Sequence, residues 1–533
     1  MALRVVLSAD LAPQLGEVVD RLVAGKVASR IAGKDFTLWG KAAESEASVR
    51  LGWVTSASDS APLLEPILAL RDEFSAQGIN RIVLCGMGGS SLAPEVITGT
   101  AHVPLVVLDS TDPDQVNAAL GGDLARTAVV VSSKSGSTVE TDSQKRVFER
   151  AFTEAGIAAT ERIVIVTDPG SPMEAAAIAD GYRVFNADPT VGGRYSALTA
   201  FGLVPSGLAG ADIAQLLAEA AGVSALLASD STDNPALVLG AAMACTPVAS
   251  GFADKIGLLI DGSPVVGLGD WAEQLIAEST GKDGKGVLPV VLEKSSAEVQ
   301  RQPADLLLAR IVAEAGGSTG AEVQVSGALG AQFLLWEYAT AVASVLLELN
   351  PFDQPDVESA KIAARTMLSQ GLAAASPPEL VDAGLEIRGL QLDLSGITTL
   401  EAALQRFLEC LSPTDGYVSV MAYLDRTSLP QAMDLRQVLA AHTGRPVTFG
   451  WGPRFLHSTG QYHKGGPKQG IYLQLLVSNQ GDLNIPGREF TFGQLIASQA
   501  AGDAKVLADL GRPVLTITLS SPSSDLLRLN SAI

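Results

Sequence analysis

The chain has 533 residues, more than one hydrophobic core usually organises, so roughly two to four domains are expected. Hydrophobic residues make up 47% of the chain and charged residues 18%, which is a globular composition without a bias towards disorder. The formal charge of −21 at pH 7 argues against nucleic acid and against an anionic membrane as partners.

The N-terminus and the cysteines suggest a cytoplasmic protein. The acidic residue Asp10 stands too near the N-terminus for a signal peptide. The longest apolar stretches are shorter than a membrane span. Cys85, Cys245 and Cys410 are widely spaced and form no metal-binding pattern. Neither a disulfide framework nor a structural metal is therefore expected.

From Arg81 onward, short apolar runs alternate with amphipathic segments. Buried strands are predicted at 82–85, 105–108, 128–132, 163–166 and 182–185. The segment 139–155 is long enough for a crossover helix. Apolar strands separated by helices predict a parallel, doubly wound sheet, whose ligands bind at the carboxyl ends of the strands.

A second and a third block follow along the chain. The second begins near Asn234, with helices at 235–249 and 331–348 and strands at 256–260 and 287–292. The stretch 373–379 (AAASPPE) predicts a linker. Beyond it, strands are predicted at 417–424, 446–449, 471–476 and 514–519, with helices at 429–442 and 492–501. The last third is therefore expected to be another α/β unit.

Two loops rich in small residues follow predicted strands. In GMGGSSL (86–92), glycines let backbone N–H groups approach an anion, although the turn lacks the GxGxxG spacing. The second, SSKSGSTVET (132–141), is called the hydroxyl loop here. Its hydroxyls and lysine, placed ahead of a helix, favour a phosphate site. A capping box of Ser137 with Glu140 is the structural alternative, and both can hold at once.

A third motif, GGRYS (192–196), follows the last strand of the first block. Its arginine could be an ordinary surface residue in a turn. Two preceding glycines would, however, let the guanidinium project into a cleft and stabilise an oxyanion.

These three motifs, in this order, resemble the sugar isomerase (SIS) domain of the phosphoglucose isomerase family. The similarity continues through ESTGK at 278–282, which is similar to a catalytic motif of the family. It reaches NPFDQPDVESAK at 350–361, which is similar to the family's FDQ segment. Each motif is weak alone, but their order over about 84–361 is a specific signal.

The resemblance implies that glucose 6-phosphate and fructose 6-phosphate are interconverted through a cis-enediolate. Glu278 matches the base that moves a proton between C1 and C2, and Arg194 matches the group facing the enediolate oxygens. Gln354 and Lys361 match the substrate-binding pair, about two turns apart on one helix face, and Lys361 joins the catalytic set. The residues that match the phosphate grip are Gly89, Ser90, Ser133, Lys134, Ser135 and Thr138.

The residues themselves suit this chemistry. A carboxylate can take a carbon proton and return it to the neighbouring carbon. The anionic intermediate needs a cation nearby, which Arg194 would supply. Such a reaction requires no metal and no redox cofactor, so none is expected.

The sequence departs from the family at the histidine that opens the sugar ring, because 281–351 contains no histidine. His102 and His442 are predicted to be solvated. His457 and His463 share the glycine-rich segment 450–467, which favours either an anion loop or a ring-opening site. We expect His457, or else His463, to open the ring, with His463 among the substrate-binding residues.

The last third of the chain resembles the isomerase half of bifunctional transaldolase–phosphoglucose isomerase proteins. The predicted fold is therefore α/β, with two SIS-type doubly wound parallel-sheet (Rossmann-like) domains and a C-terminal α/β unit. The predicted boundaries are an N-terminal helical segment at 1–55, a first SIS domain at 56–205, a second at 206–375 and a C-terminal domain at 376–533.

Other readings keep the fold but change the function. The substrate could be another phosphosugar, such as mannose 6-phosphate or a pentose phosphate, because pocket size does not show in the sequence. A catalytically silent protein that senses a phosphosugar is the third reading. The presence of both Glu278 and Arg194 argues against it, since a sensor needs no base. The expected partner is a phosphorylated hexose, and a homodimer is implied only by the family.

Overall fold

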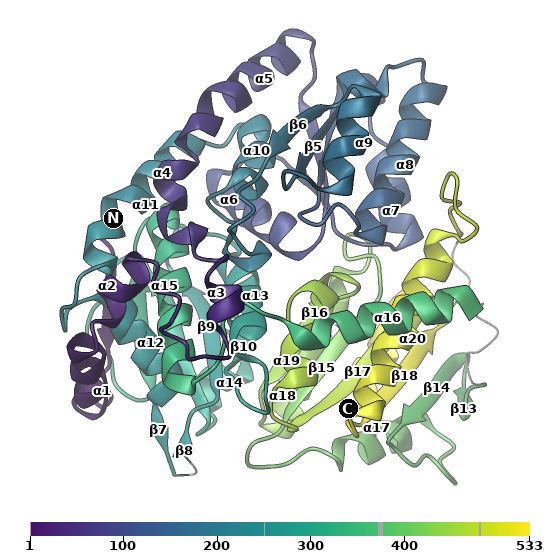
Figure 1. Cartoon of the computed structure of the whole chain (residues 1–533). Coiled ribbons are helices and arrows are strands. Elements are labelled where there is room, and N and C mark those ends of the chain that lie inside the picture. The colour runs from purple at the N-terminus through teal and green to yellow at the C-terminus, as the bar shows by residue number, and fades with distance from the viewer. Residues whose placement is uncertain (1, 250, 371–376, 479–480) are drawn as a thin grey trace.

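The computed structural model describes residues 2–249, 251–370, 377–478 and 481–533 (Figure 1). Three main sheets, each largely parallel and flanked by helices, make up its framework. The chain is thus α/β throughout, as the alternation of apolar runs and amphipathic segments predicted.

The first sheet has the strand order β3-β2-β4-β5-β6, and every pairing in it is parallel. Its strands are β2 (Arg81–Gly86), β3 (Val106–Leu108), β4 (Thr127–Ser132), β5 (Ile163–Thr167) and β6 (Arg183–Asn186). The helices that follow them are α6 (Leu92–Ala101), α7 (Pro113–Leu120), α8 (Val139–Glu154) and α9 (Pro172–Asp180). All five strands were predicted, because strands covered on both faces are apolar at nearly every position.

The second sheet has the order β1-β12-β11-β9-β10. Its strands are β1 (Arg4–Leu7), β9 (Lys255–Asp261), β10 (Leu288–Leu292), β11 (Leu306–Val312) and β12 (Glu322–Ser326), and its main helices are α1 (Ala12–Ala24), α11 (Ile213–Leu227), α12 (Pro235–Cys245), α13 (Leu268–Thr280) and α15 (Leu329–Leu347). Strand β1, in the segment predicted as helical, runs antiparallel to β12. The predicted helix 235–249 ends early at Cys245, where a short hairpin begins.

The third sheet has the order β13-β14-β18-β17-β15-β16. Its strands are β13 (Leu380–Asp382), β14 (Leu385–Leu390), β15 (Tyr417–Ala422), β16 (Val447–Trp451), β17 (Gly470–Val477) and β18 (Val514–Leu519). Its helices are α17 (Leu400–Leu408), α18 (Asp434–Thr443), α19 (Gly460–Gly465), α20 (Phe492–Asp509) and α21 (Pro522–Ala532). The four predicted strands form its parallel part, and β13 and β14 add antiparallel strands at one edge.

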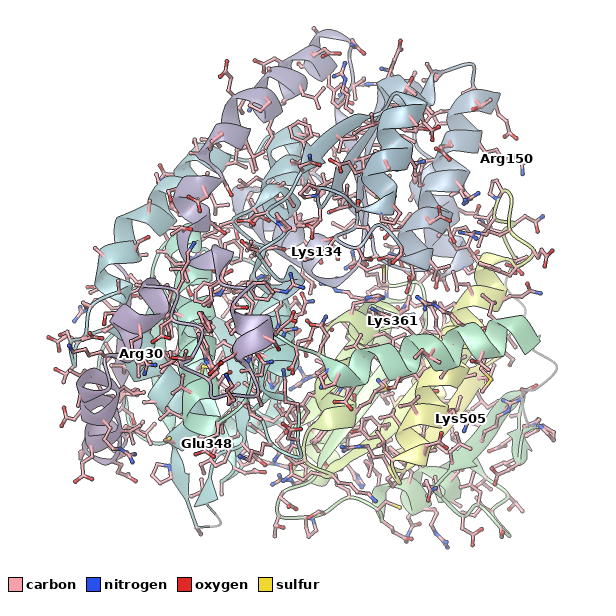
Figure 2. The ribbon with its side chains drawn as sticks, viewed as in Figure 1. Arg30, Lys134, Arg150, Glu348, Lys361 and Lys505 are labelled. Carbon is pink, nitrogen blue, oxygen red and sulfur yellow. The ribbon has the colours of Figure 1, made fainter. Side chains whose placement is uncertain are left out.

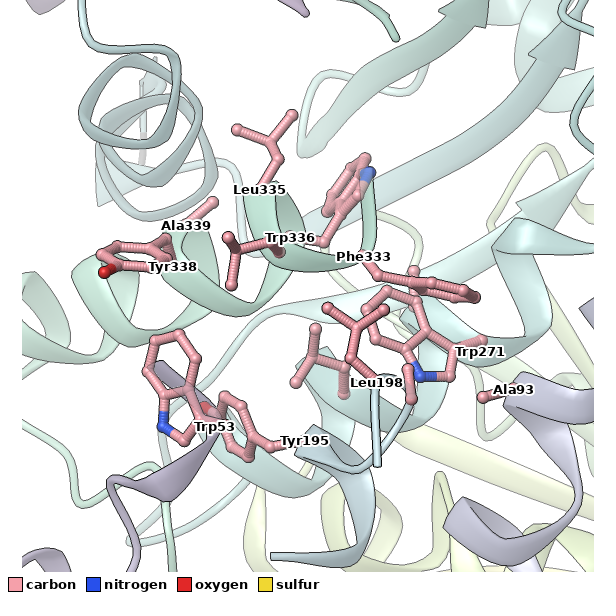
Figure 3. Packing of buried hydrophobic residues seen from close by; sticks show 14 of the residues in the cluster. Trp53, Ala93, Tyr195, Leu198, Trp271, Phe333, Leu335, Trp336, Tyr338 and Ala339 are labelled. Atoms are coloured by element: carbon pink, nitrogen blue, oxygen red, sulfur yellow. The ribbon is translucent and has the colours of Figure 1, made fainter. Parts of the chain in front are cut away.

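Helix α15 lies at the centre of the core that the first two sheets share. The rings of Trp271 and Phe333 lie 4.6 Å apart, and Trp53 lies 5.1 Å from both Tyr195 and Tyr338 (Figure 3). Contrary to the expectation that every apolar stretch is shorter than a membrane span, α15 has the length and composition of one, but 89% of its apolar window is buried inside the protein. It is apolar on all sides because other elements surround it.

The domain boundaries predicted at residues 55, 205 and 375 stay a prediction. One hydrophobic cluster continues from the first sheet into the second, so the packing itself does not divide them. Most of the predicted linker 373–379 lies outside the described residues.

Buried ion pairs dock the third sheet on the rest of the molecule. Arg436 pairs with Glu298 at 2.8 Å, and the two side chains are only 6% and 1% exposed. Lys255 lies 2.8 Å from Asp305, which also accepts a hydrogen bond from Arg445. Hydrophobic clusters further join this sheet to both of the others. The C-terminal unit (residues 380–533) is therefore packed against both sheets.

Replacing Arg436 with methionine should lower the free energy of unfolding by about 3–5 kcal/mol, because the Glu298 carboxylate would stay buried without its partner. Urea denaturation measures the change. The matched control is Arg150→Met, whose arginine is 60% exposed beside Glu154. Its expected effect is below about 1 kcal/mol, and equal losses in the two variants would contradict the docking role of Arg436.

Candidate active site

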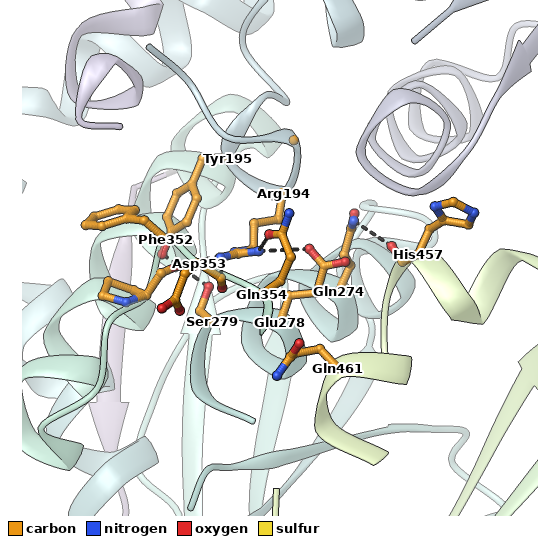
Figure 4. A network of polar contacts seen from close by, with 12 residues as sticks. Arg194, Tyr195, Gln274, Glu278, Ser279, Phe352, Asp353, Gln354, His457 and Gln461 are labelled. Carbon is orange, nitrogen blue, oxygen red and sulfur yellow. Dashed lines mark hydrogen bonds and ion pairs between the residues drawn. The ribbon is translucent and has the colours of Figure 1, made fainter. Parts of the chain in front are cut away.

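Arg194 and Glu278 form a buried ion pair between the first and second sheets. Glu278 lies in the last turn of α13, and Arg194 lies in the short helical turn Gly193–Tyr195. Arg194 Nη1 donates to Glu278 Oε2 at 3.1 Å, and the two side chains are 3% and 9% exposed. Figure 4 shows the guanidinium pointing at the carboxylate. Two residues predicted from separate motifs are thus in direct contact.

The segment before α16 (Pro355–Gln370) wraps around the same guanidinium. Arg194 Nη2 donates to the carbonyl oxygens of Pro351 and Asp353, both at 2.8 Å. Its Nη1 also donates to Gln354 Oε1. Gln354 stands one residue before α16 rather than inside it, so it is held by this turn and not by the helix.

The glycine-rich turn after β2 touches the turn that carries Arg194. A Cβ on Gly89 would collide with the carbonyl of Gly193, so only glycine lets the two turns approach this closely. Ser196 Oγ donates to Gly193 O at 2.6 Å and lies 3.4 Å from Gly89 O. Ser90, next in the turn, is buried. The turn is therefore held beside Arg194.

The hydroxyl loop folds back on itself ahead of α8. Ser133 Oγ lies 3.0 Å from Thr138 Oγ1, and Ser135 Oγ lies 3.0 Å from Ser137 Oγ. Thr138 is the N-cap residue of α8, and its hydroxyl turns to Ser133. The first backbone N–H groups of a helix point towards the residues that precede it. Clustered hydroxyls at a helix N-terminus are an arrangement that suits an anion.

The capping box predicted as the alternative for this loop is wrong. The N-cap position is taken by Thr138 and not by Ser137. The Glu140 carboxylate does not turn back to the loop but accepts a hydrogen bond from Gln499 Nε2 at 2.7 Å and pairs with His457.

Lys134 of the hydroxyl loop pairs with Asp168 at 2.5 Å. Burial lowers the pKa of Lys134, against the opposing effect of Asp168, and burial raises the pKa of Asp168. Burial therefore disfavours the charged form of both groups. A phosphate dianion beside Lys134 would be a stronger counter-ion than this single carboxylate.

His457 reaches this region from the C-terminal unit. Its Nε2 lies 3.0 Å from Glu140 Oε1 in the first turn of α8, and its carbonyl oxygen accepts a hydrogen bond from Gln274 Nε2 at 2.7 Å. Gln274 is one turn before Glu278, so both lie on the same face of α13 (Figure 4). The backbone of His457 thus lies beside the helix that carries Glu278, whereas its imidazole, 15% exposed, faces Glu140 on α8.

The Glu140 carboxylate stays ionised although it is buried. Burial acts to raise its pKa, but the charge and hydrogen bond of His457, and the charge of Lys361, hold the pKa below its ordinary value. Lys361 is half-buried in the second turn of α16 (Figure 2). A carboxylate beside Nε2 orients the imidazole.

His463 does not join the other predicted residues. It is 1% exposed, its Nδ1 lies 3.0 Å from Tyr417 OH, and its Nε2 lies 3.2 Å from Ser419 Oγ. Burial, together with the charge of Lys464, lowers the pKa of His463 well below its ordinary value. The predicted substrate contact therefore does not fit the structure, in which His463 is a neutral core residue of the third sheet.

The anion loop predicted as one reading of this glycine-rich segment is also wrong. Arg454 pairs with Glu95 at 2.8 Å, and Lys464 pairs with Asp503 at 2.6 Å. Since carboxylates already neutralise both cations, the segment presents little positive charge to a ligand.

The polar residues at the site that lie outside the predicted set include Gln274, Lys282 and Gln461. The position of Gln274, four residues before Glu278, could have revealed it, because this spacing places two side chains on one helix face. Lys282 closes the ESTGK sequence. Gln461 has no local pattern and became visible only through its contacts.

Lys282 holds the segment that surrounds Arg194. Its Nζ donates to Asn350 O, Asp353 O and Asp353 Oδ1, each at 2.7 Å. The side chain is 2% exposed. Burial, followed by the nearby charge of Arg194, lowers the pKa of Lys282 to about 8.

A family model described as phosphoglucose isomerase matches residues 72–286, a range that includes Arg194 and Glu278. Over this range the chain is similar to the phosphoglucose isomerase family. The match ends before Gln354, Lys361 and His457.

Curated relatives carry the same description. A probable glucose-6-phosphate isomerase of Haloarcula marismortui is 37% identical over 212 residues, which are 39% of this chain and 48% of that protein. The glucose-6-phosphate isomerase of Rubrobacter xylanophilus is 29% identical over 367 residues, or 56% of this chain and 84% of that protein. The chain spans about half the length, or less, of the first curated relatives it matches.

Two solved structures share the fold. A hypothetical protein of Thermus thermophilus superposes with a TM-score of 0.57 at 25% identity, covering 68% of this chain and 99% of that one. A glucose-6-phosphate isomerase of Chlamydia trachomatis does so with a TM-score of 0.54 at 18% identity, covering 68% and 87%. The likeness of the last third to bifunctional transaldolase proteins stays a prediction.

The pKa of Lys282 predicts a pH-dependent contribution to stability. In the folded protein this pKa is about 8, below the ordinary value of 10.5. At a pH between these two values, Lys282 is therefore protonated in the unfolded chain but largely neutral in the folded protein. The free energy of unfolding of the wild type, relative to Lys282→Met, should therefore rise as the pH increases through this range. Urea denaturation from pH 7.5 to 10 measures it, with Lys505→Met, whose lysine is 54% exposed, as the control. If the free energies of unfolding of the wild type and Lys282→Met change with pH in parallel, the lowered pKa of Lys282 is contradicted.

Proposed function

We propose that the protein is an aldose–ketose isomerase that interconverts glucose 6-phosphate and fructose 6-phosphate. The observation that carries the proposal is the buried contact of Arg194 with both Glu278 and Gln354. The family match supports it, and so do the relatives described as glucose-6-phosphate isomerases.

Glu278 is the base of the proposed reaction. Its carboxylate takes the proton from C2 of the open-chain aldose and returns it to C1, while the hydroxyl proton of O2 moves to O1. The product is the ketose, and no atom is gained or lost. Between the two steps the cis-enediolate carries negative charge on its oxygens, and Arg194 is the cation placed to stabilise that charge.

The hydroxyl loop binds the phosphate in this proposal. Lys134 exchanges the Asp168 carboxylate for the phosphate dianion, and the hydroxyls and backbone N–H groups ahead of α8 donate to its oxygens. The residues assigned to this grip are Gly89, Ser90, Ser133, Lys134, Ser135 and Thr138. Gln354 and Lys361, on the opposite side, are assigned to the sugar.

His457 opens the sugar ring in this proposal. Opening a hexopyranose moves a proton from the hydroxyl on C1 to the ring oxygen, which a histidine can do near neutral pH. The contact with the ionised Glu140 supports the assignment, because it orients the imidazole. The cytoplasmic location predicted from the sequence and the homodimer implied by the family are part of the same proposal.

Glu278→Gln should lower kcat on glucose 6-phosphate by about 10²–10⁴-fold, because an amide cannot accept the carbon proton. A coupled assay of fructose 6-phosphate formation measures it, with mannose 6-phosphate and a pentose phosphate as rival substrates. Glu273→Gln is the matched control, since Glu273 is a second buried carboxyl on α13. Turnover that survives Glu278→Gln would refute the mechanism, and wild-type binding without turnover would favour a sensor.

His457→Ala should slow turnover of glucose 6-phosphate by about 10-fold or more, because the ring would open without an acid–base group. It should leave turnover of erythrose 4-phosphate close to that of the wild type. The phosphate on O4 prevents this sugar from closing a ring, so it needs no ring opening. Steady-state kinetics on both substrates make the comparison, and equal losses on the two would argue against a ring-opening role.

A further inference from the structure

The short helix α19 of the C-terminal unit lies between two elements that carry site residues. It contacts α13, which bears Glu278, and α16, which begins one residue after Gln354. Figure 1 shows α19 beside the start of α16. The helix therefore joins the base-bearing helix to the segment that surrounds Arg194.

The side-chain amide of Gln461 bridges these two elements. Its Nε2 donates to Gly281 O at 2.8 Å and to Asp356 Oδ2 at 2.7 Å, while its Oε1 accepts from the backbone N–H of Asp356 at 3.0 Å. The residue is 0% exposed. Both N–H groups of the Gln461 amide and one acceptor site of its oxygen therefore form hydrogen bonds. All of the partners lie on other elements.

The backbones around this amide are in close contact. A Cβ on Gly281 would collide with the backbone of Tyr462, so the end of α13 approaches α19 more closely than a side chain would allow. The backbone N–H of Gly284 donates to Gly465 O at 2.9 Å. A shift of Gln461 would therefore be passed directly to the segment that follows Glu278.

We propose that Gln461 is a positioning residue for the proton transfer, one that sets Glu278 relative to Gln354 and Lys361. This inference rests on the proposed function of the site. Gly281 is three residues beyond Glu278, so loss of the bridge frees the end of the base-bearing helix. The hydroxyl loop on the other side of the site is untouched. A displacement of about 1 Å at a reacting group can cost about 10²-fold in rate.

Gln461→Met removes the bridge while keeping a side chain of similar length. We expect kcat on glucose 6-phosphate to fall by about 10–100-fold, with KM changed by less than about threefold because the phosphate grip is intact. The matched control is Gln474→Met. Gln474 is a glutamine of the same unit, 1% exposed, whose Nε2 donates to Ala500 O at 3.2 Å. The control should keep the wild-type kcat even where it lowers the Tm equally.

Amide hydrogen exchange tests the bridge independently of turnover. Exchange in 278–284 and at Asp356 should be faster in Gln461→Met and not in Gln474→Met, because Gln461 accepts from the Asp356 amide. Wild-type kcat in Gln461→Met, or a kcat loss shared by both variants, would overturn the positioning role. Unchanged exchange would overturn the bridge itself. A wild-type protein that turns over none of the sugar phosphates would instead overturn the proposed function.

Discussion

The buried guanidinium of Arg194 is the constraint on which the geometry of this site depends. A desolvated cation must have its charge balanced and its N–H groups bonded, or it costs several kcal/mol. Arg194 meets this need with one carboxylate, from Glu278, and with acceptors on the segment 351–354. Three regions far apart in the sequence are thereby brought to one point. The same contacts that satisfy the cation place the Glu278 carboxylate and the Gln354 amide beside the guanidinium.

The C-terminal unit completes the surroundings of this pair. It is docked through buried ion pairs such as Arg436 with Glu298, and through hydrophobic clusters shared with both other sheets. From that position two short elements reach inwards, the turn that ends at His457 and the helix that carries Gln461. Both lie beyond residue 286, where the family match ends. The C-terminal unit can therefore bring a histidine to the site, although residues 281–351 contain none.

Charge alone does not distinguish a functional cation from a structural one in this acidic chain. Lys464 and Arg454 stand in a glycine-rich segment, which is the setting expected of an anion site, yet each is neutralised by a carboxylate. Lys134 is also paired, but its partner Asp168 is a half-buried group whose pKa burial has raised. The cations also differ in access, because the Lys134 side chain is 23% exposed, whereas those of Arg454 and Lys464 are 11% and 1% exposed.

The sequence by itself determined the α/β class, the strands of the first sheet and the motifs around Arg194, Glu278 and the hydroxyl loop. These follow from local periodicity and from short runs of residues, both of which can be read directly from the sequence. It did not reveal β1, β11 or β12, whose places in the sheet depend on pairing with distant strands. Only the tertiary structure separated His457 from His463, six residues apart, because one faces Glu140 and the other faces a tyrosine core. Gln461 likewise gained its meaning only from partners 105 and 180 residues away, since hydrogen bonds across such distances leave no mark in local sequence.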